Sequence, residues 1–404
     1  MANEDPTLHP VLVAGTGPIG LIAALALARA GHRVLLAGPR PGSADRRTTA
    51  LMRPSLEALA RLGLAEALES AGEPLRTMRI VDATARLVRS PTVTFNAAEI
   101  DAPYFGLNVA NAKLLEILLA AVDAEPLVER RETVVASWTP MADRVAARFE
   151  DGGTADALLV VAADGRASPA REAAGIAGHR RTLPQTALVV NFAHTRDHNS
   201  VSTEFHTPTG PFTQVPLEGR RSSLVWVERP ERAAELAAMD DASLSRLIED
   251  RMDSMLGRVT VEDGRQTYPL IEFTPQRYGR SRIALVGEAA HVFPPIGAQG
   301  MNLGIRDVTD LVDCLGAATA DPGADAVLSA YERRRRPDVL MRSNAVNLLN
   351  RSLLSDFLPA QLARSAGLEA LRRFAPLRAF AMREGLSPGS GFASIWRSRK
   401  QVGR

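Results

Sequence analysis

Cysteine is almost absent from this sequence, which has a single one, Cys314, among 404 residues. One thiol cannot form an internal disulfide framework, and it leaves no cysteine cluster for a structural zinc site. We therefore expect no metal site, and we expect a reducing compartment such as the cytoplasm as the natural location. Cys314 lies in an apolar helical pattern, which indicates a core residue rather than a reactive thiol.

A targeting segment is also lacking. The N-terminal sequence MANEDPTLHP has no basic region followed by an apolar one, as a secretory signal would. One apolar run, Val11 to Ala28, is about as long as a membrane span, but glycines and a proline interrupt it. The interruption favours a strand, a tight turn and a helix over a transmembrane helix. No internal repeat, low-complexity linker or nucleic-acid module is present, so no nucleic-acid partner is expected.

Charge is nearly balanced over the whole chain but not at its C-terminal end. The net charge is +2, and 46% hydrophobic with 23% charged residues is typical of a soluble globular protein. Residues 331–404, however, contain fifteen lysines and arginines against five acidic residues. This basic helical region is suited to anionic lipid or an acidic partner, although a solvated helix face explains it equally well.

The N-terminal region has the pattern of a dinucleotide-binding unit. An apolar strand, Val11 to Ala14, runs into GTGPIG and an apolar helix, and Val34 to Ala37 is the next strand. In this context Gly15 permits a tight turn, Gly17 permits close approach of a pyrophosphate, and Gly20 permits helix packing. A purely structural glycine turn is the alternative.

The usual acidic residue for the ribose hydroxyls is missing, because the second strand runs into Ala37-Gly38-Pro39-Arg40. Arg40 by itself leaves open a 2′-phosphate, and hence NADP instead of FAD. Further on, Arg46 and Arg47 precede a helix and are suited to binding a pyrophosphate bidentately, although surface arginines are an equal alternative.

The segment Ile283 to Asp307 has the layout of a flavin-binding loop. Its first residues form an apolar strand that ends at Gly287, and prolines and glycines follow. A helical pattern begins after Gly300. Free N–H groups and the positive end of the helix dipole then favour an electron-rich ligand edge, such as a reduced flavin ring, at Gly300, Met301 and Asn302. An ordinary strand-loop-helix connection is the alternative.

Two central segments complete the pattern. Asp164 follows the buried strand Leu158 to Ala162, which places it at the crevice where α/β sheets bind ligands, although a simple Asp-Gly turn is the alternative. From Thr186 onward, short β-rich segments predict a mainly antiparallel sheet that forms a substrate domain. A greasy substrate would suit a face of this sheet, near the following apolar residues, for each of which core packing is the alternative: Phe205, Phe212, Val215 and Trp226.

Several motifs together resemble the FAD-dependent aromatic-ring monooxygenases, and more narrowly the ubiquinone-biosynthesis hydroxylases of the UbiH/VisC-like group. They are GTGPIG, DRRTTAL, AADGRAS and GEAAHVFPPIGAQGMNLGIRD, accompanied by FGLNVANAKLLEILL, EF…GP…VPL and YERRRRPD. The likeness covers nearly the whole chain.

The resemblance implies an α/β fold with a Rossmann-like FAD-binding domain of the glutathione-reductase type. An inserted, mainly antiparallel substrate sheet and a C-terminal helical region would complete it. The FAD-binding domain would comprise residues 1–75, 104–182 and 276–335, the substrate domain 76–103 and 183–275, and the basic helical region 336–404.

The resemblance also implies FAD as the bound coenzyme and NAD(P)H as a transient co-substrate, which resolves the question raised by Arg40. The residues expected at the coenzyme are Gly15, Gly17, Pro18, Ile19, Gly20, Arg47, Lys113, Val135, Asp164, Gly287, Glu288, Pro295, Gly300, Met301 and Asn302. Asp164 would also lie near the nicotinamide, and Glu288 would bind the ribityl hydroxyls.

Some positions depart from the family pattern. Glu288 stands where aspartate is usual, Lys113 stands where arginine is frequent, and Gly297 to Gly300 has an altered order. No Ser/His/Asp or metal constellation is present, so no catalytic residue is assigned. His291 follows the flavin-loop strand and is expected to be structural rather than a general base.

The implied reaction is hydroxylation of a polyprenylated phenol in ubiquinone biosynthesis, with NAD(P)H and O₂, through a flavin C4a-hydroperoxide. The coenzyme supplies the difficult chemistry, and the protein positions the ring and excludes water. Contact of the basic C-terminal region with a membrane surface or a biosynthetic complex would suit such a substrate. A hydroxylase of a small aromatic acid and a non-catalytic flavin- or quinone-binding subunit are the alternatives.

Overall fold

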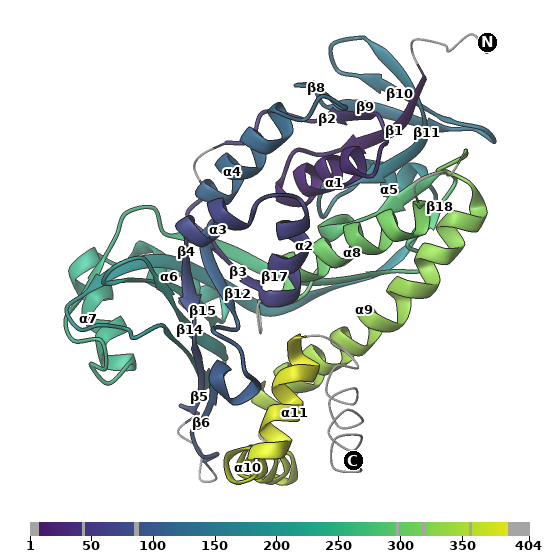
Figure 1. Ribbon diagram of the computed structural model, residues 1–404. Coiled ribbons are helices and arrows are strands. Elements are labelled where there is room, and N and C mark those ends of the chain that lie inside the picture. The colour runs from purple at the N-terminus through teal and green to yellow at the C-terminus, as the bar shows by residue number, and fades with distance from the viewer. Residues whose placement is uncertain are drawn as a thin grey trace.

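The structure is a computed structural model that describes residues 8–42, 45–84, 89–295, 299–316, 320–354 and 358–386. Side chains are described outside 344–354 and 358–360. The chain forms a mainly parallel sheet, a mainly antiparallel sheet and a small sheet between them, with helices on their faces (Figure 1). This arrangement confirms the predicted α/β class.

The first sheet has the strand order β18-β19-β11-β1-β2-β8, and β9 and β10 extend it from β11. The strands β19, β11, β1, β2 and β8 are parallel to one another, and a helix, α1, makes the crossover from β1 to β2. The strands are β1 (Leu8–Ala14), β2 (Val34–Ala37), β8 (Val128–Arg131), β9 (Val135–Pro140), β10 (Val145–Phe149), β11 (Thr154–Ala162), β18 (Gly279–Arg280) and β19 (Ile283–Leu285).

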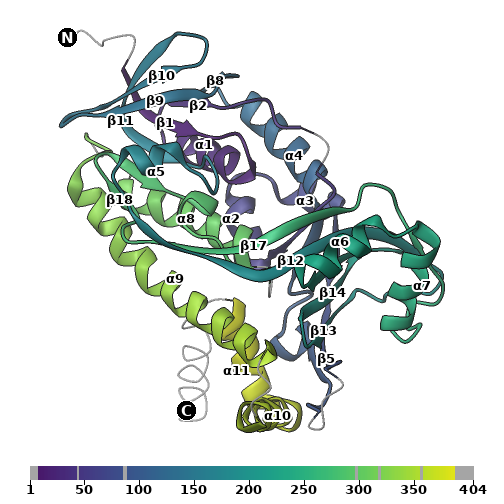
Figure 2. The same cartoon turned by 180° about the vertical axis from the view of Figure 1, so that it is seen from behind.

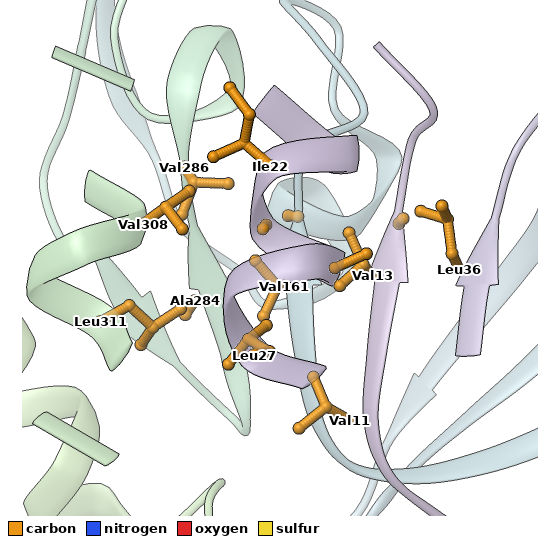
Figure 3. Packing of buried hydrophobic residues seen from close by; sticks show 14 of the residues in the cluster. Val11, Val13, Ile22, Leu27, Leu36, Val161, Ala284, Val286, Val308 and Leu311 are labelled. Carbon is orange, nitrogen blue, oxygen red and sulfur yellow. The ribbon is translucent and has the colours of Figure 1, made fainter. Parts of the chain in front are cut away.

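Apolar helices cover this sheet and form the main core. Helix α1 (Pro18–Arg29) is apolar on nearly all sides, and it lies between α4 (Asn111–Asp123) and α8 (Gln299–Leu315). Figure 3 shows how Ile22 and Leu27 of α1 meet strand and α8 side chains. The half-buried Cys314 packs against this core, as predicted, and burial raises the pKa of its thiol. Short helices α5 (Pro169–Ala173) and η2 (Gly287–Ala289) follow β11 and β19.

The second sheet has the order β16-β12-β15-β14-β13-β5-β6, and β17 pairs with β12. Strand β12 is 17 residues long, and with β17 it connects the second sheet to the first half of the molecule (Figure 2). The elements are β5 (Thr77–Asp82), β6 (Val93–Asn96), β12 (Gly178–His194), β13 (Val201–Thr207), β14 (Gly210–Leu217), β15 (Arg221–Glu228), β16 (Val259–Val261) and β17 (Gln266–Pro275), with helices α6 (Pro230–Ala238) and α7 (Asp241–Arg251) on one face.

A small sheet of order β3-β7-β4 stands between the two larger ones. It consists of β3 (Thr48–Met52), β7 (Gly106–Ala110) and β4 (Gly72–Leu75), and helices α2 (Arg53–Arg61) and α3 (Ala65–Ala71) connect β3 to β4. The sequence did not predict β3, because its five residues are followed at once by a helix and its partner β7 comes much later in the chain.

Three helices end the described chain: α9 (Asp325–Leu354), α10 (Leu358–Arg373) and α11 (Ala375–Leu386). Helix α9 runs along the molecule, and α10 and α11 turn back beneath the β5 and β6 end of the second sheet (Figures 1 and 2). Met382 of α11 packs there with the short helix η1 (Ala97–Ile100) and with Met78 of β5. Among the described residues, no helix has the length and apolar character needed to cross a bilayer.

Candidate functional site

The glycine turn after β1 is shaped by close backbone contacts. A Cβ on Gly15, whose φ is +110°, would lie 2.3 Å from the carbonyl oxygen of Ala163, and a Cβ on Gly20 would lie 1.8 Å from that of Gly15. A Cβ on Gly17 would meet nothing within 4 Å. Gly17 is the N-cap of α1, and its lack of a side chain leaves the helix N-terminus facing open space. This is the arrangement that accepts a pyrophosphate.

Ile19 brings a second helix N-terminus beside the first. A Cβ on Gly287 would lie 3.1 Å from Ile19, and one on Gly304 would lie 2.7 Å from it. Small residues at these positions therefore let α8 and η2 approach the first turn of α1. Pro18 occupies the first turn of α1, where a missing N–H costs nothing.

The side-chain amide of Asn302 anchors the start of α8. The Oδ1 of Asn302 accepts from the N–H of Met52 at 2.8 Å, and its Nδ2 donates to the carbonyl of Ala50 at 2.8 Å. The Asn302 side chain thus pairs with the edge of β3 and is not free for a ligand. Gly300 is exposed, and a Cβ there would meet nothing within 4 Å, so the N–H groups of this first turn can face a flat ligand.

Arg47 lies beside this region. Its guanidinium donates to the carboxylate of Asp45 at 2.9 Å and 2.8 Å and lies 5.0 Å from the centre of the Tyr268 ring. The hydrogen bond to Asp45 raises the pKa of Arg47, so it stays cationic. Asn111 donates to the same carboxylate at 2.9 Å, which fixes the loop against α4.

Glu288 is ion-paired with Arg166 at 2.9 Å, and both side chains are exposed, at 51% and 36%. The charge of Glu288 also acts on Arg47, so these groups share one neighbourhood. An exposed pair of this kind is held weakly, which leaves the Glu288 carboxylate able to exchange its partner for a ligand hydroxyl.

Asp164 is engaged within its own turn. Its carboxylate accepts from the Ser168 hydroxyl at 2.5 Å and from the N–H of Ala170 at 3.0 Å, so it orders the start of α5. Burial raises the pKa of Asp164, and these hydrogen bonds offset only part of that rise. Its backbone N lies 3.1 Å from where a Cβ of Gly15 would stand, so the backbone rather than the carboxylate adjoins the glycine turn.

The remaining expected residues lie farther from these contacts. Lys113 extends outward from α4 and pairs with Glu116 at 3.0 Å. Val135 is buried at the start of β9, and Met301 is partly buried against the main core. Pro295 is half-buried at the end of the loop, whereas the altered Gly297 lies outside the described residues.

A buried ion network, not predicted from the sequence, holds the flavin loop. Asp307 is fully buried and accepts from the N–H of Gly287 at 2.9 Å and from Arg335 Nε at 2.7 Å, and His291 Nε2 lies 2.7 Å away. Arg335, also fully buried, donates to Asp310 at 2.7 Å. Burial raises the pKa of Asp307, but the charges of His291 and Arg335 outweigh it, so the pKa lies below its usual range. His291 is therefore structural here, as expected.

The substrate-face hypothesis is wrong for three of its four residues. Phe205, Phe212 and Trp226 are buried in the core beneath α6 and α7, where Phe212 lies 5.6 Å and 5.1 Å from the other two ring centres. Strand alternation puts the residues between them on the opposite face. That face carries Val215 and also the acidic Glu204, for which no sequence motif predicted a functional role.

A glycine turn at the N-terminus of α1, with η2 and α8 packed against Ile19 and a loop arginine nearby, forms a site suited to a dinucleotide. The chain belongs to the FAD binding domain family, whose members it matches over residues 9–342. This membership confirms the predicted FAD coenzyme and the prediction of an FAD-dependent oxidoreductase.

Similar proteins share the whole architecture. Ubiquinone hydroxylase UbiL of Rhodospirillum rubrum is 36% identical over 389 residues, covering 93% of this chain and 89% of that protein. The 3-demethoxyubiquinol 3-hydroxylase of Escherichia coli is 31% identical, covering 96% and 100%. The crystal structure of P. aeruginosa PqsL in complex with 2-aminobenzoylacetate has a TM-score of 0.76 and 26% identity, covering 90% and 99%. The predicted resemblance to ubiquinone-biosynthesis hydroxylases is thereby confirmed.

Replacing Asp307 with Asn should lower the free energy of unfolding by about 1.5–3 kcal/mol, because the buried Arg335 would lose its fully buried carboxylate partner and keep only Asp310 and Asp338. Urea unfolding followed by circular dichroism measures this. Asp313→Asn is the matched control, since Asp313 pairs with Arg334 in solvent, and it should cost about 1 kcal/mol or less.

The contribution of the Asp307 carboxylate to stability should depend on pH. Because its folded pKa is lowered, the stabilisation from Asp307 is complete above the unfolded-state pKa of about 3.9 and is lost as the pH falls through the folded pKa. The stability difference between wild type and Asp307→Asn should therefore shrink below about pH 4. A difference that stays constant down to the acid transition would contradict the assigned role.

Gly17→Ala should leave the melting temperature of the FAD-free protein unchanged, because a Cβ there meets nothing within 4 Å. It should weaken FAD binding about tenfold or more, because the methyl group would occupy the approach of the pyrophosphate. Fluorescence titration with FAD measures the affinity. Gly367→Ala, at an equally open helical position, is the control; equal affinities of the two variants would rule out a ligand at Gly17.

Proposed function

We propose that this protein is a monooxygenase that hydroxylates the aromatic ring of a polyprenylated phenol in ubiquinone biosynthesis, with NAD(P)H and O₂ as co-substrates. The observation that carries the proposal is similarity over the full length to UbiL and to 3-demethoxyubiquinol 3-hydroxylase, which includes the substrate-domain sheet and not only the coenzyme half. Membership of the FAD-binding family and the glycine turn after β1 support FAD-dependent oxygenation.

The residues around the glycine turn fit FAD. Gly17 at the α1 N-terminus would hold the pyrophosphate, Arg47 and Glu288 would bind its phosphate and ribityl oxygens, and the first turn of α8 would face the flavin ring. Bound FAD supplies the redox chemistry, with NAD(P)H as the reductant and O₂ as the oxygen source. Residues 8–42 contain no carboxylate that could bind the ribose hydroxyls. At the end of β2, the ribose would instead meet backbone groups and Thr16, whose hydroxyl donates to the carbonyl of Pro39.

In this scheme the protein positions and desolvates the reacting ring. The N-terminus of α8 would offer a partial positive charge to the ring of bound FAD and would thereby stabilise negative charge on it. Opposite it, the face of the second sheet that carries Val215 faces away from α6 and α7. A ring held between these surfaces would be screened from water, which suppresses unproductive breakdown of the activated oxygen.

The C-terminal helices offer a route to a lipid-tailed substrate. Leu362, Phe374 and Leu377 are exposed at 51%, 60% and 43%, and the exposed Arg372 and Arg373 lie beside Phe374. Apolar side chains next to cationic ones suit the interface of an anionic membrane. We therefore include peripheral membrane contact through α10 and α11 in the proposal.

A second candidate is hydroxylation of a small aromatic acid. The similarity to PqsL, whose structure contains 2-aminobenzoylacetate, favours it. It keeps the same coenzyme chemistry and changes only the substrate that the second sheet accepts.

Anaerobic stopped-flow mixing should show that NAD(P)H reduces the bound FAD, and that a prenylated phenol accelerates the reduction. Under air, mass spectrometry should find one added oxygen in the prenylated phenol and much less in the unprenylated acid, because the ring site would continue into an apolar path for the tail. Preference for the small acid would favour the second candidate. Absence of reduction with every phenol would contradict a monooxygenase.

Phe374→Ser combined with Leu377→Ser should reduce sedimentation with vesicles of phosphatidylglycerol and phosphatidylcholine by about tenfold, since two apolar anchors are lost. Met141→Ser is the control, because Met141 is similarly exposed, at 46%, on the β9–β10 hairpin far from α10 (Figure 1). Equal binding by wild type and the double variant would contradict membrane contact through α11.

A further inference from the structure

One face of the second sheet packs in the hydrophobic core under α6 and α7, and the opposite face is turned away from those helices. Phe205 of β13 stands opposite Phe212 of β14, and both face α6 and α7. The alternating residues Glu204 and His206 therefore point to the other face. On β5, which runs parallel beside β13, Ile80 is the register partner of Glu204.

This other face adjoins the start of α8. Met78 lies two residues before Ile80, hence on the same face, and it packs with Met52 and with Met382 of α11. The N–H of Met52 is bonded to Asn302 in the first turn of α8. Glu204 therefore lies on the face of the sheet that packs, at Met78, toward the start of α8.

Glu204 and His206 form a buried acid–base pair. Glu204 Oε1 is 2.9 Å from His206 Nε2, and their side chains are 16% and 2% exposed. An ionised carboxylate can only accept, so the Nε2 proton belongs to His206. The Nδ1 of His206 is buried and has no hydrogen-bond partner within the described part of the chain. The other Glu204 oxygen has a long 3.5 Å contact with the hydroxyl of Thr213.

A second buried carboxylate on this face, Asp82, is the contrasting case. It accepts from the N–H and the hydroxyl of Thr84, from the N–H of Ser90 and from Arg364 at 2.8 Å. Burial raises the pKa of Asp82, but these hydrogen bonds and the charge of Arg364 outweigh it and lower the pKa. Asp82 is therefore a saturated, permanently ionised carboxylate.

Glu204 differs because it has acceptor capacity left and remains partly accessible. The groups that face the pair are Ile80 and Asp82 from β5, Thr213 and Pro211 from β14, and Arg364 through its contact with Asp82. The part of α11 that packs on this face contributes the apolar Ala379 and Met382. The Glu204 carboxylate can exchange its weak Thr213 contact for a hydrogen bond to a hydroxyl group of a bound ring.

We propose that Glu204 is the catalytic base that takes the proton from the phenolic hydroxyl of the substrate, with His206 as the positioning residue that orients it. This inference rests on the proposed function. As the ring accepts the oxygen, the phenol O–H bond breaks, its electron pair stays on the ring oxygen, and a new O–H bond forms on Glu204. The negative charge of the carboxylate thus passes to the ring oxygen, and the hydrogen bond from His206 orients the carboxylate for the transfer. Loss of the proton makes the ortho and para carbons more electron-rich at the moment when one of them accepts the oxygen.

The test is the ionisation of a bound phenol, which requires no turnover. The probe is 2-geranylphenol, whose phenol and phenolate forms differ in ultraviolet absorbance, titrated from pH 6 to 10 with the FAD-loaded protein. Bound to the wild type, it should ionise about one pH unit or more above the free probe, because the Glu204 carboxylate beside the phenol oxygen disfavours a second negative charge. In Glu204→Gln this shift should vanish, and Glu204→Asp should restore part of it.

The rate of hydroxylation should also be highest in the wild type, lower in Glu204→Asp and lowest in Glu204→Gln. At pH 7, Glu204→Gln should form product about 10²-fold more slowly, the range expected for loss of a general base, while reduction of FAD by NAD(P)H is unchanged. His206→Asn should shift the pH dependence with a smaller loss. Glu262→Gln, which removes a surface pair with Arg221 that is 30% and 48% exposed, is the control and should behave as the wild type.

The outcomes separate the two proposals. If the wild type binds and hydroxylates the probe while Glu204→Gln, folded and loaded with FAD, retains the same ionisation midpoint and rate, the role of Glu204 is overturned and the proposed function stands. A wild-type protein that binds the phenol without raising its midpoint overturns the role in the same way. A wild type that binds no phenol overturns both.

Discussion

A single buried carboxylate, Asp307, determines where the coenzyme half can place its ligand-binding backbone. It holds the N–H of Gly287, the ring of His291 and the guanidinium of Arg335 within 2.9 Å, and it thereby joins the end of the parallel sheet to α8 and α9. Removing these charges from water is unfavourable unless every partner is present. The network therefore fixes η2 relative to α8 and α9, and both η2 and α8 pack against Ile19 in the first turn of α1.

The second sheet must be stable and must also carry functional side chains on one of its faces. Its aromatic residues Phe192, Phe205, Phe212 and Trp226 turn toward α6 and α7 and form a core on that side of the sheet. The opposite face can then carry groups that are costly to bury, including Asp82 and Glu204. The free-energy cost of burying these two carboxylates is offset differently. Asp82 accepts hydrogen bonds from several donors, including Ser90 and Arg364, whereas Glu204 pairs with His206 and stays partly accessible. Functional sites commonly retain such incompletely satisfied groups.

Local patterns allowed much of the coenzyme half to be predicted. The glycine turn, strands β1, β2 and β11, and the start of α8 each follow from adjacent residues, as did the structural role of His291. Contacts between distant segments could not be predicted: Asp307 and Arg335 are 28 positions apart, and β3 finds its partner β7 only in the folded chain. Alternation along β13 does signal that Glu204 and His206 share a face, but not that this face meets α8. For Asp164 the motif indicated the right turn, and the structure shows its carboxylate committed to α5.

The central claim is that the α1 turn, the Arg47 loop and the α8 loop converge on one molecule of FAD. Its most direct test is the visible spectrum of the purified protein, followed by calorimetric titration of the flavin-free form with FAD and with riboflavin. The account predicts a yellow protein that rebinds one FAD per chain, and far weaker binding of riboflavin, which lacks the phosphates that Gly17 and Arg47 would contact. A colourless protein that takes up no FAD, or one that binds riboflavin equally well, would contradict it.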